Sequence, residues 1–514
     1  MNKLFSVIIV YKDTHKYISE SIESVINQNF SLDKVEIILV NDKSSDNSKE
    51  IADFYQERYP NMIKSVESLG IGISAGKNTG LSYATGKYVN FLDSDDLLQS
   101  EVFSSVKNFF EKNSECKLAA IPMVMFENNR DPHMLNKKFT YSRIIDIRDE
   151  PQSIQLSTAS AFINRDAISE NFNESISIGE DTFFLTNLIC ETGSYGIVAD
   201  TYYLYRKRID NSSALQNTYE NDEYYTRFFD IVIKGLYKKY RESDYSDYVE
   251  NVIGYNLQWP LRKQNYPSTI DKEVIDDFYS SALKILMTFK TLEPIKNMKY
   301  ISYHQKEYLL RLYNEVHGKK YRLLTFENDI ILLNGDSKVD SISKLTVLPI
   351  MIEYVDESLV LIFRMASKFR NEDIEKINFY ATYKGKKIKP SIKKDRVTKL
   401  LGHTVKYYWD FIFKIPQDKI EGNSNFIFYG SYNGVTKKIG LFKKDITREI
   451  SRKTKLEYSK KILKVIKKNP EKNIERNIEK ESIIAPKKIF EKKQTEKEPF
   501  IRRVLSKIKR IVIK

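Results

Sequence analysis

The fold of this chain is decided by residues 70–96, which read GIGISAGKNTGLSYATGKYVNFLDSDD. A glycine-rich loop is followed by a helical stretch and an apolar run at residues 88–92, and Asp93, Asp95 and Asp96 come directly after that run. Three carboxylates at the tip of a buried strand repel one another and lose hydration unless a cation binds there. The pattern therefore predicts either a site for one hard divalent cation, which prefers oxygen ligands, or caps for a helix that begins near Leu97.

Alternating strands and helices surround this stretch over roughly the first 215 residues. Apolar strands are predicted at residues 5–10, 35–40, 88–92 and 117–124. The first is followed by a helix with Ile18, Ile22, Val25 and Ile26 on one face, and the polar residues before Asn47 can cap another helix. Near-continuous apolar strands are typical of parallel sheets covered on both faces. Because ligands of such sheets bind beyond the carboxyl ends of the strands, Asp42 and residues 93–96 are candidate site residues.

The pattern changes twice further along the chain. Residues 219–320 show helical periodicity, with one apolar stripe from Tyr225 to Leu236 and another from Phe278 to Phe289. Residues 323–442 alternate with a period of two and include a hairpin-type Asn433-Gly434 turn, which predicts an antiparallel β-sandwich. We therefore expect an α/β domain at residues 1–218, a helical subdomain at 219–322, a β-sandwich at 323–450 and a tail at 451–514.

The net charge of +14 is concentrated in the tail. Residues 452–514 hold 22 Lys and Arg against 8 Asp and Glu, so the remaining residues hold 61 of each sign. Residues 500–514 have the pattern of a basic amphipathic helix, for which three roles stay open: docking on an anionic membrane, a seam between subunits, or a solvated tail. A neutral body, and a tail without interleaved aromatic residues, argue against a nucleic-acid partner.

The expected location is the cytoplasm, peripheral to the inner face of the cell membrane. The N-terminus has no signal pattern, and no apolar run reaches the roughly 20 residues that a membrane-spanning helix needs. Cys116 and Cys190 have neither disulfide-framework nor metal-ligand spacing, which indicates ordinary core thiols in a reducing compartment.

Residues 70–96, together with FSVIIVYKDTHKYISESIESVINQ at 5–28 and EIILVNDKSSDNS at 36–48, resemble the nucleotide-sugar-binding half of family 2 glycosyltransferases, which have the GT-A fold. The resemblance implies that Asp42 binds the base of a UDP-sugar, and that Val10, Tyr11 and Ser94 also lie at the donor. It implies that Asp93 contacts the ribose or sugar and, with Asp95, binds Mg²⁺ or Mn²⁺. For Asp96, the sequence context instead favours a cap of the next helix. Gly76-Lys77-Asn78 stands where the family commonly has Ala-Arg-Asn in its glycine-rich loop. Lys77 therefore keeps the positive charge of the arginine but not its planar guanidinium.

A second carboxylate motif and a basic loop complete the resemblance. In ISIGEDTFFLTNLICETG, residues 176–193, Asp181 corresponds to the base that deprotonates the acceptor hydroxyl and Glu180 to a supporting group. The alternative is a charge pair that interacts only with the helix dipole. In YLYRKRIDNSSA, residues 203–214, Arg206, Arg208 and Ser212 correspond to ligands of the donor diphosphate. The alternative for the arginines is solvated loop charges.

The order of these motifs and of the later segments is similar to that of the wall-teichoic-acid poly(ribitol phosphate) N-acetylglucosaminyltransferases. This implies an inverting, metal-dependent transfer of an N-acetylhexosamine or hexose from a UDP-sugar to a teichoic acid or capsular polysaccharide, by a homo-oligomer that is a trimer or dimer. The β-sandwich then binds polymer, joins subunits or serves as a scaffold. The competing interpretation is a non-catalytic polymer-binding protein on a glycosyltransferase scaffold.

Overall fold

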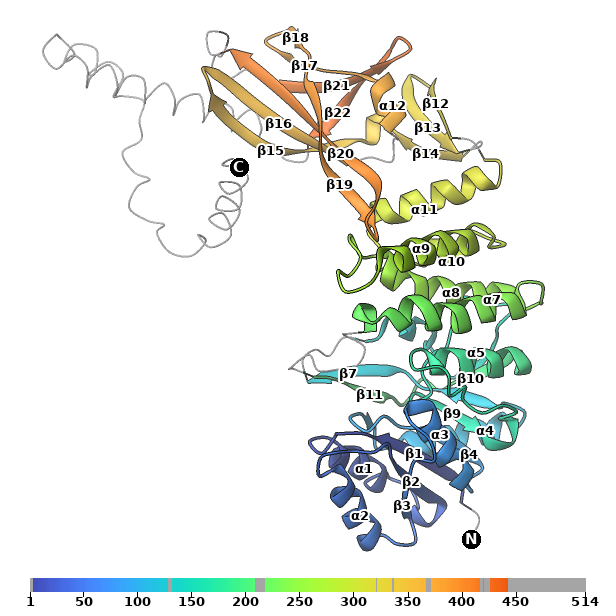
Figure 1. Cartoon of the computed structure of the whole chain (residues 1–514). Coiled ribbons are helices and arrows are strands. Elements are labelled where there is room, and N and C mark those ends of the chain that lie inside the picture. The colour runs from blue at the N-terminus through green and yellow to red at the C-terminus, as the bar shows by residue number, and fades with distance from the viewer. Residues whose placement is uncertain are drawn as a thin grey trace, which may run out of the picture.

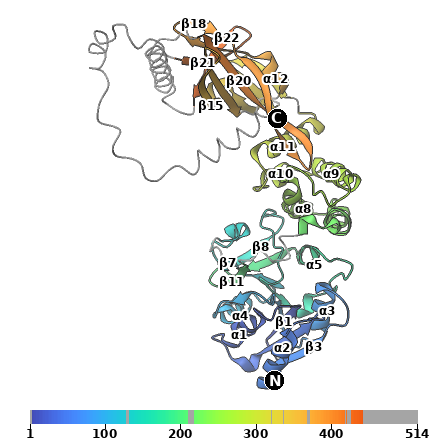
Figure 2. The same cartoon turned by 60° about the vertical axis from the view of Figure 1, so that its left-hand side comes forward.

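The computed structural model describes residues 3–127, 132–208, 218–319, 321–334, 337–366, 371–416, 419 and 426–441. These residues form three tiers along one long axis, with the N-terminal α/β part at one end, helices in the middle and a β-rich part at the other end (Figure 1). Figure 2 shows the same order of tiers from a second direction. Within the described ranges, no helix is both long and apolar enough to cross a membrane.

An eight-stranded sheet forms the centre of the first tier, in the order β3-β2-β1-β4-β9-β6-β10-β8. Its strands are β1 (Phe5–Tyr11), β2 (Val35–Asn41), β3 (Ile63–Glu67), β4 (Tyr88–Phe91), β6 (Leu118–Ala120), β8 (Arg143–Asp146), β9 (Ala161–Asn164) and β10 (Ser194–Ile197). The first four strands run parallel, and β9 lies antiparallel between β4 and β6. The predicted α/β organisation is therefore confirmed, and β1 separates the carboxyl end of β2 from that of β4.

Helices cover both faces of this sheet. One face packs against α1 (Ile18–Ile26), α2 (Ser48–Arg58) and α4 (Val102–Lys112), and the other packs against α3 (Ile73–Tyr83) and α5 (Glu180–Thr192). Successive residues of β1 point to opposite faces, so Ile9 lies under α1 whereas Val10 lies under α3. Helix α3 approaches β1 closely because Gly76 has no side chain, since a Cβ atom there would lie 2.5 Å from Val10 Cγ1.

The strand predicted at residues 117–124 is divided in the structure. Pro122 has no N–H to donate to a strand partner, and it separates β6 from β7 (Met123–Glu127). Strand β7 belongs to a small second sheet, in which β11 (Tyr203–Lys207) lies between β7 and β5 (Leu97–Leu98). This small sheet places residues 93–98 beside residues 203–208. Short 3₁₀ helices complete the tier: η1 (Leu32–Lys34), η2 (Met134–Lys138), η3 (Arg165–Ala167) and η4 (Thr218–Glu220).

The second tier is helical, as the sequence predicts. It consists of the π-helix η5 (Tyr224–Lys234) and the helices α7 (Gly235–Tyr240), α8 (Ser246–Leu261), α9 (Lys272–Met287), α10 (Glu293–Lys296) and α11 (Tyr303–Val316). The predicted apolar stripes on η5 and α9 are buried and share one core with α5. The helical tier therefore packs directly on the α/β tier.

The third tier is β-rich. Its larger sheet has the order β18-β17-β21-β22-β15-β16-β20-β19 and bends so that Phe363 and Phe411 on one half pack against Phe428 on the other. The pairing is antiparallel except between β15 and β22, which run parallel. Asn433 and Gly434 have φ angles of 47° and 80° and form the predicted hairpin turn. The elements are β12 (Tyr321–Phe326), β13 (Asp329–Asn334), β14 (Ser337–Ser341), η6 (Ile342–Lys344), β15 (Thr346–Val355), β16 (Ser358–Ala366), α12 (Asn371–Lys376), β17 (Asn378–Tyr383), β18 (Lys386–Ile388), β19 (Ser391–Leu400), β20 (His403–Pro416), β21 (Phe426–Tyr432) and β22 (Val435–Leu441).

The tip of the β19–β20 hairpin joins the third tier to the second. Leu400 and Leu401 at this tip are fully buried in the core of the helical tier. The Leu401 N–H donates to the Lys263 carbonyl at 3.0 Å, and Gln305 Nε2 donates to the Lys399 carbonyl at 2.7 Å. Apolar burial and backbone hydrogen bonds therefore hold the two tiers together.

Candidate active site

The acidic residues after β4 form a loop that is held by β11. Asp96 is 1% exposed, and its carboxylate accepts hydrogen bonds from the Tyr203 hydroxyl and from the Arg206 N–H, the latter at 2.6 Å. Burial, followed by the neighbouring Asp93 and Asp95, raises the pKa of Asp96 well above its usual value. The prediction that Asp96 caps a helix is wrong, because β5 follows it and α4 begins only at Val102.

Asp93 and Asp95 occupy different environments in this loop. Asp93 accepts a hydrogen bond from the Tyr203 hydroxyl at 3.2 Å. Burial raises the pKa of Asp93 to about 7, with a further contribution from Asp181 and Asp95 and an opposing one from Lys77. Asp95 accepts a hydrogen bond from Arg208 Nε at 2.9 Å and forms an ion pair with an Nη atom of the same guanidinium at 2.7 Å. The Arg208 guanidinium therefore compensates the charge of Asp95, whereas burial and the neighbouring carboxylates disfavour the charged form of Asp93 in spite of Lys77.

The donor set of this loop fits a divalent cation that also binds a substrate. Within the described part of the chain, no three Asp, Glu, His or Cys side chains form a complete metal site. Mg²⁺ in enzymes usually binds through one or two carboxylates and completes its coordination with substrate phosphates and water. Asp93 and Asp95 supply two such carboxylates, provided that Arg208 leaves Asp95.

Arg206 is engaged with the protein on every side. Its side chain is 3% exposed, and its guanidinium contacts the Asp95 carbonyl at 2.6 Å, Glu20 at 2.9 Å and Glu127. Burial would lower the pKa of Arg206, but Glu20 and Glu127 outweigh it and raise the pKa. Arg206 therefore holds the acidic loop through the Asp95 carbonyl and the Asp96 carboxylate, whereas Arg208 pairs with the Asp95 carboxylate. Ser212, the third predicted diphosphate ligand, is outside the described residues.

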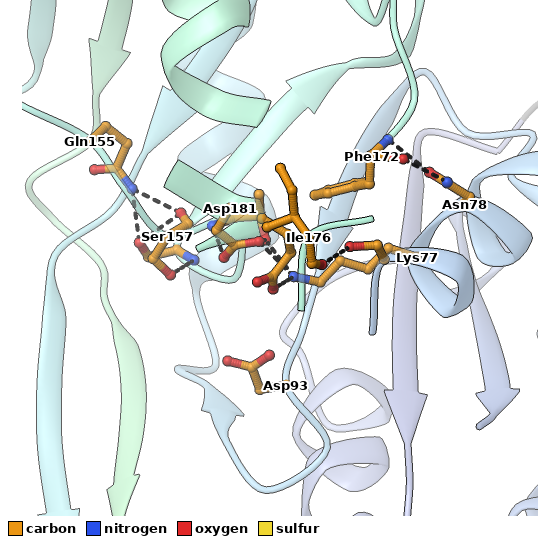
Figure 3. Close-up of polar contacts among 12 residues, drawn as sticks. Lys77, Asn78, Asp93, Gln155, Ser157, Phe172, Ile176 and Asp181 are labelled. Carbon is orange, nitrogen blue, oxygen red and sulfur yellow. Dashed lines mark hydrogen bonds and ion pairs between the residues drawn. The ribbon is translucent and has the colours of Figure 1, made fainter. Parts of the chain in front are cut away.

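A buried lysine lies at the centre of the second carboxylate cluster (Figure 3). Lys77 Nζ on α3 lies 2.5 Å from Asp181 Oδ1 and 2.9 Å from Glu180 Oε1, the first two residues of α5. Burial alone would lower the pKa of Lys77, but Asp181, Glu180 and Asp93 outweigh it and raise the pKa above its usual value. Helix α5 starts here because Gly179 has a φ of 79°, and a Cβ atom at this glycine would lie 2.4 Å from the Phe228 ring.

Thr158 binds both oxygens of Asp181, and the sequence patterns do not reveal it. Its hydroxyl donates to Asp181 Oδ1 at 2.7 Å and its N–H to Oδ2 at 2.9 Å. The segment around Thr158 is held by the Asn90 amide, which donates to the Ala159 and Ala161 carbonyls at 2.8 and 2.9 Å. Asn90 lies in β4, directly before the acidic loop, so one strand supports both carboxylate clusters.

Asn78 holds the segment that leads to Gly179. Its side-chain amide donates to the Phe172 carbonyl at 2.9 Å and to Glu174 at 3.0 Å, and its oxygen accepts from the Phe172 N–H at 2.8 Å. Ser74 donates to the Ile176 carbonyl of the same segment at 3.1 Å. In this structure Asn78 therefore positions protein backbone, and its predicted contact with a donor stays a prediction.

The remaining predicted donor residues lie at the carboxyl ends of β1 and β2. Asp42 Oδ1 accepts from the Gly72 N–H at 3.0 Å, and Lys12 Nζ lies 3.9 Å from Asp42 Oδ2. The Tyr11 ring is buried in the core and has no exposed face on which a base could stack, and Val10 packs against α3. Ser94 is buried in the acidic loop.

Comparison with known proteins is consistent with this geometry. A family model described as Glycosyl transferase family 2 matches residues 6–172. The chain is 30% identical over 436 residues to the minor teichoic acid biosynthesis protein GgaB of Bacillus subtilis (strain 168), an alignment that covers 83% of this chain and 48% of GgaB. It is also 30% identical over 327 residues to the minor teichoic acid biosynthesis protein GgaA of the same organism, over 61% of this chain and 72% of GgaA.

Among solved structures, the crystal structure of S. aureus TarS is similar with a TM-score of 0.46 and 15% identity, over 85% of this chain and 77% of that chain. The chain spans about half the length of GgaB.

Proposed function

Because the chain belongs to glycosyl transferase family 2, we propose that it transfers a sugar from a UDP-sugar to a hydroxyl group of a teichoic acid or related cell-surface polymer, with inversion at the anomeric carbon. The names of GgaB and GgaA support the class of acceptor. An N-acetylhexosamine or a hexose is the proposed sugar. The chain thereby acts in the synthesis of a cell-wall or capsular polymer.

The observation that carries this proposal is the placement of Asp181, whose orientation Thr158 fixes, on the side of Lys77 that faces Asp93 of the acidic loop (Figure 3). Asp181 and Asp93 both act on the buried ammonium of Lys77, which links the two clusters electrostatically. A base on one side and a cation-binding carboxylate pair on the other are the two functions that transfer from a sugar diphosphate requires.

In the proposed reaction, Asp181 takes the proton of the acceptor hydroxyl. The oxygen of that hydroxyl forms a bond to the anomeric carbon as the bond from this carbon to the diphosphate breaks, and UDP leaves with the bonding electrons. Thr158 and Lys77 keep the Asp181 carboxylate in one orientation, which matters because proton transfer requires hydrogen-bond distance. A Mg²⁺ or Mn²⁺ held by Asp93 and Asp95 would neutralise the charge of the diphosphate.

Residues outside the carboxylate clusters have proposed roles at the donor. Asp42 binds the nucleobase, and Arg208 moves from Asp95 to the diphosphate when the donor binds. Lys77, buried between two carboxylates, forms an ion pair with Asp181 and does not bind the donor phosphate. Val10 contributes its backbone, since its side chain is buried under α3.

The test is UDP-sugar turnover by the full chain with Mg²⁺ or Mn²⁺, with and without a polymer acceptor. Asp181→Asn should lower kcat by about 10²–10⁴-fold, the range for loss of a general base. The matched control is Asp230→Asn, at an exposed carboxylate that pairs with Lys234 on η5. Polymer binding without turnover of any UDP-sugar would instead favour a non-catalytic polymer-binding protein.

Two further proposals rest on the sequence. Residues 500–514 bind anionic membranes and place the chain at the inner face of the cell membrane, and the chain forms a homo-oligomer, either a trimer or a dimer. Liposome flotation of the full chain and of a chain that ends at residue 499 tests the first. Light scattering tests the second. The domain ranges 1–218, 219–322, 323–450 and 451–514 stay predictions.

A further inference from the structure

Three lysines gather where η2 of the first tier meets the helical tier. Lys137 and Lys299 are exposed, and Lys306 is half-buried. Contact with the Lys137 ammonium, followed by partial burial and the charge of Lys306, lowers the pKa of Lys299. Among the described residues, no carboxylate forms an ion pair with any of the three lysines. Like charges held side by side repel one another, and an anion between them would remove that cost.

The backbone around Lys299 is fixed by contacts with α8. The N–H groups of Lys299 and Tyr300 both donate to Gln258 Oε1 on α8, at 2.9 and 3.2 Å. Gln258 is fully buried. Lys306 Nζ donates to the Lys296 carbonyl at 3.0 Å, which holds the third ammonium against the same surface. Lys299 and Lys306 are therefore carried by packed elements of the helical tier.

An aromatic pair lies next to these charges. The Tyr300 ring is 43% exposed and stacks on Trp259, with ring centroids 4.4 Å apart and an interplanar angle of 29°. The Arg262 guanidinium lies 5.9 Å from the Trp259 ring centroid. A half-exposed ring next to cations offers a flat apolar face and positive charge together. The apolar face suits the carbon skeleton of a sugar or polyol, and the positive charge suits phosphate.

We propose that Lys137, Lys299 and Lys306, with the Trp259–Tyr300 pair, bind a polymer of sugars or polyols joined by phosphodiesters. This inference rests on the proposed function, because it assigns the binding surface for the acceptor polymer away from the catalytic carboxylates. A polymer held here keeps its reactive hydroxyl near Asp181 during repeated encounters, which raises the effective concentration of that hydroxyl.

The proposed surface and the catalytic base share structural support. Lys138, next to Lys137 in η2, is buried and donates from Nζ to the Ile154 carbonyl at 2.6 Å and to Gln155 Oε1 at 2.8 Å. Gln155 in turn donates to the Ser157 carbonyl at 2.9 Å, and Thr158 follows with its two bonds to Asp181. Figure 3 shows Gln155 and Ser157 on the side of Asp181 away from Asn78.

The test measures binding of the full chain to poly(glycerol phosphate), with dextran as an uncharged polymer and single-stranded DNA as a polyanion without this backbone. The charge-reversal variant is Lys137→Glu/Lys299→Glu. Its matched control, Lys272→Glu/Lys284→Glu, makes the same charge change at two exposed lysines of α9. Tyr300→Ala tests the aromatic part. UDP-sugar hydrolysis without acceptor is measured for every variant.

The expected result is that Lys137→Glu/Lys299→Glu weakens binding of poly(glycerol phosphate) about tenfold near 0.1 M salt, with a smaller effect at high salt. Tyr300→Ala should weaken it several-fold, and the control should match the parent chain. UDP-sugar hydrolysis should stay unchanged in all variants, so that KM for the polymer rises while the catalytic step persists.

Equal polymer binding by the parent and Lys137→Glu/Lys299→Glu, with normal UDP-sugar hydrolysis, would overturn the inference and leave the proposed function intact. If no UDP-sugar is hydrolysed, yet polymer binding still depends on these lysines, the binding surface is supported and the proposed function fails. Binding of single-stranded DNA as tight as that of the polymer, without loss in Tyr300→Ala, would overturn the assignment to a sugar or polyol phosphate.

Discussion

Replacement of Lys77 by methionine should destabilise the chain more than any change at an exposed ion pair. Its side chain is 4% exposed, and its ammonium lies 2.5 Å from Asp181 and 2.9 Å from Glu180. Removing one partner of a buried ion pair costs about 3–5 kcal/mol, because the remaining charge is left uncompensated. Thr158 still donates two hydrogen bonds to Asp181, and the Glu180 side chain is 15% exposed, so we expect the lower limit of this range.

A loss of about 3 kcal/mol should lower the melting temperature by roughly 6 °C or more, given about 2–4 °C per kcal/mol for units of this size. The measurement is thermal unfolding of the full chain followed by fluorescence and circular dichroism. Lys107→Met is the matched control, because Lys107 pairs with Glu111 at 2.8 Å on the exposed surface of α4. An exposed pair of this kind contributes only about 0.5 kcal/mol.

A second variant separates loss of the ion pair from loss of packing. Adding Asp181→Asn to Lys77→Met removes the uncompensated carboxylate, so the double variant should melt above Lys77→Met alone. The reasoning would be refuted if Lys77→Met and Lys107→Met melted within about 1 °C of each other, or if Asp181→Asn lowered the melting temperature of Lys77→Met further.

Three other predictions concern the base, the acidic loop and pH. Thr158→Val removes the hydroxyl hydrogen bond to Asp181 and should lower kcat for transfer about tenfold, with little change in KM for the UDP-sugar. Thr158→Ser keeps a hydroxyl and should restore kcat. Steady-state kinetics test this, and a serine variant no better than valine would contradict it. Arg208→Gln should increase Mn²⁺ affinity several-fold in calorimetry without donor, since the guanidinium no longer competes for Asp95; an unchanged affinity would argue against Asp95 as a ligand. Burial raises the folded-state pKa of Glu250 from 4.5 to about 7, so its stabilising contribution is complete below pH 4.5 and is lost as pH rises through 7, by about 3 kcal/mol in total. Urea unfolding at pH 5 and pH 8 should show this loss in the parent chain and not in Glu250→Gln, and equal losses in both would contradict it.

Local sequence patterns predict those parts of the fold that depend on neighbouring residues. The strands at 5–10 and 35–40, the helix from Ile18 and the Asn433-Gly434 turn follow from short-range periodicity and turn chemistry, and the structure confirms them. The start of α5 at Glu180 is also local, because Gly179 permits a left-handed backbone directly before the two carboxylates. The two acidic motifs were therefore visible in the sequence.

The partners of these motifs could not be predicted, because they lie far away along the chain. Asp96 has the sequence context of a helix cap, yet its partners Tyr203 and Arg206 come from β11, more than 100 residues later. Thr158 lies in a stretch without a motif, and only the folded chain brings it to Asp181. Burial of the Tyr11 ring likewise depends on which face of β1 meets α2.

The β19–β20 tip has a consequence for any shortened version of the chain. Leu400 and Leu401 are buried against apolar side chains of the helical tier, although they belong to the third tier by sequence. A fragment that ends at residue 319 would keep every described residue to which we assign a catalytic role, but it would expose to water the apolar surface that Leu400 and Leu401 cover. Such a fragment should self-associate or dissolve poorly. A separate peptide of residues 399–403 should bind this apolar surface, so that the fragment becomes monodisperse again.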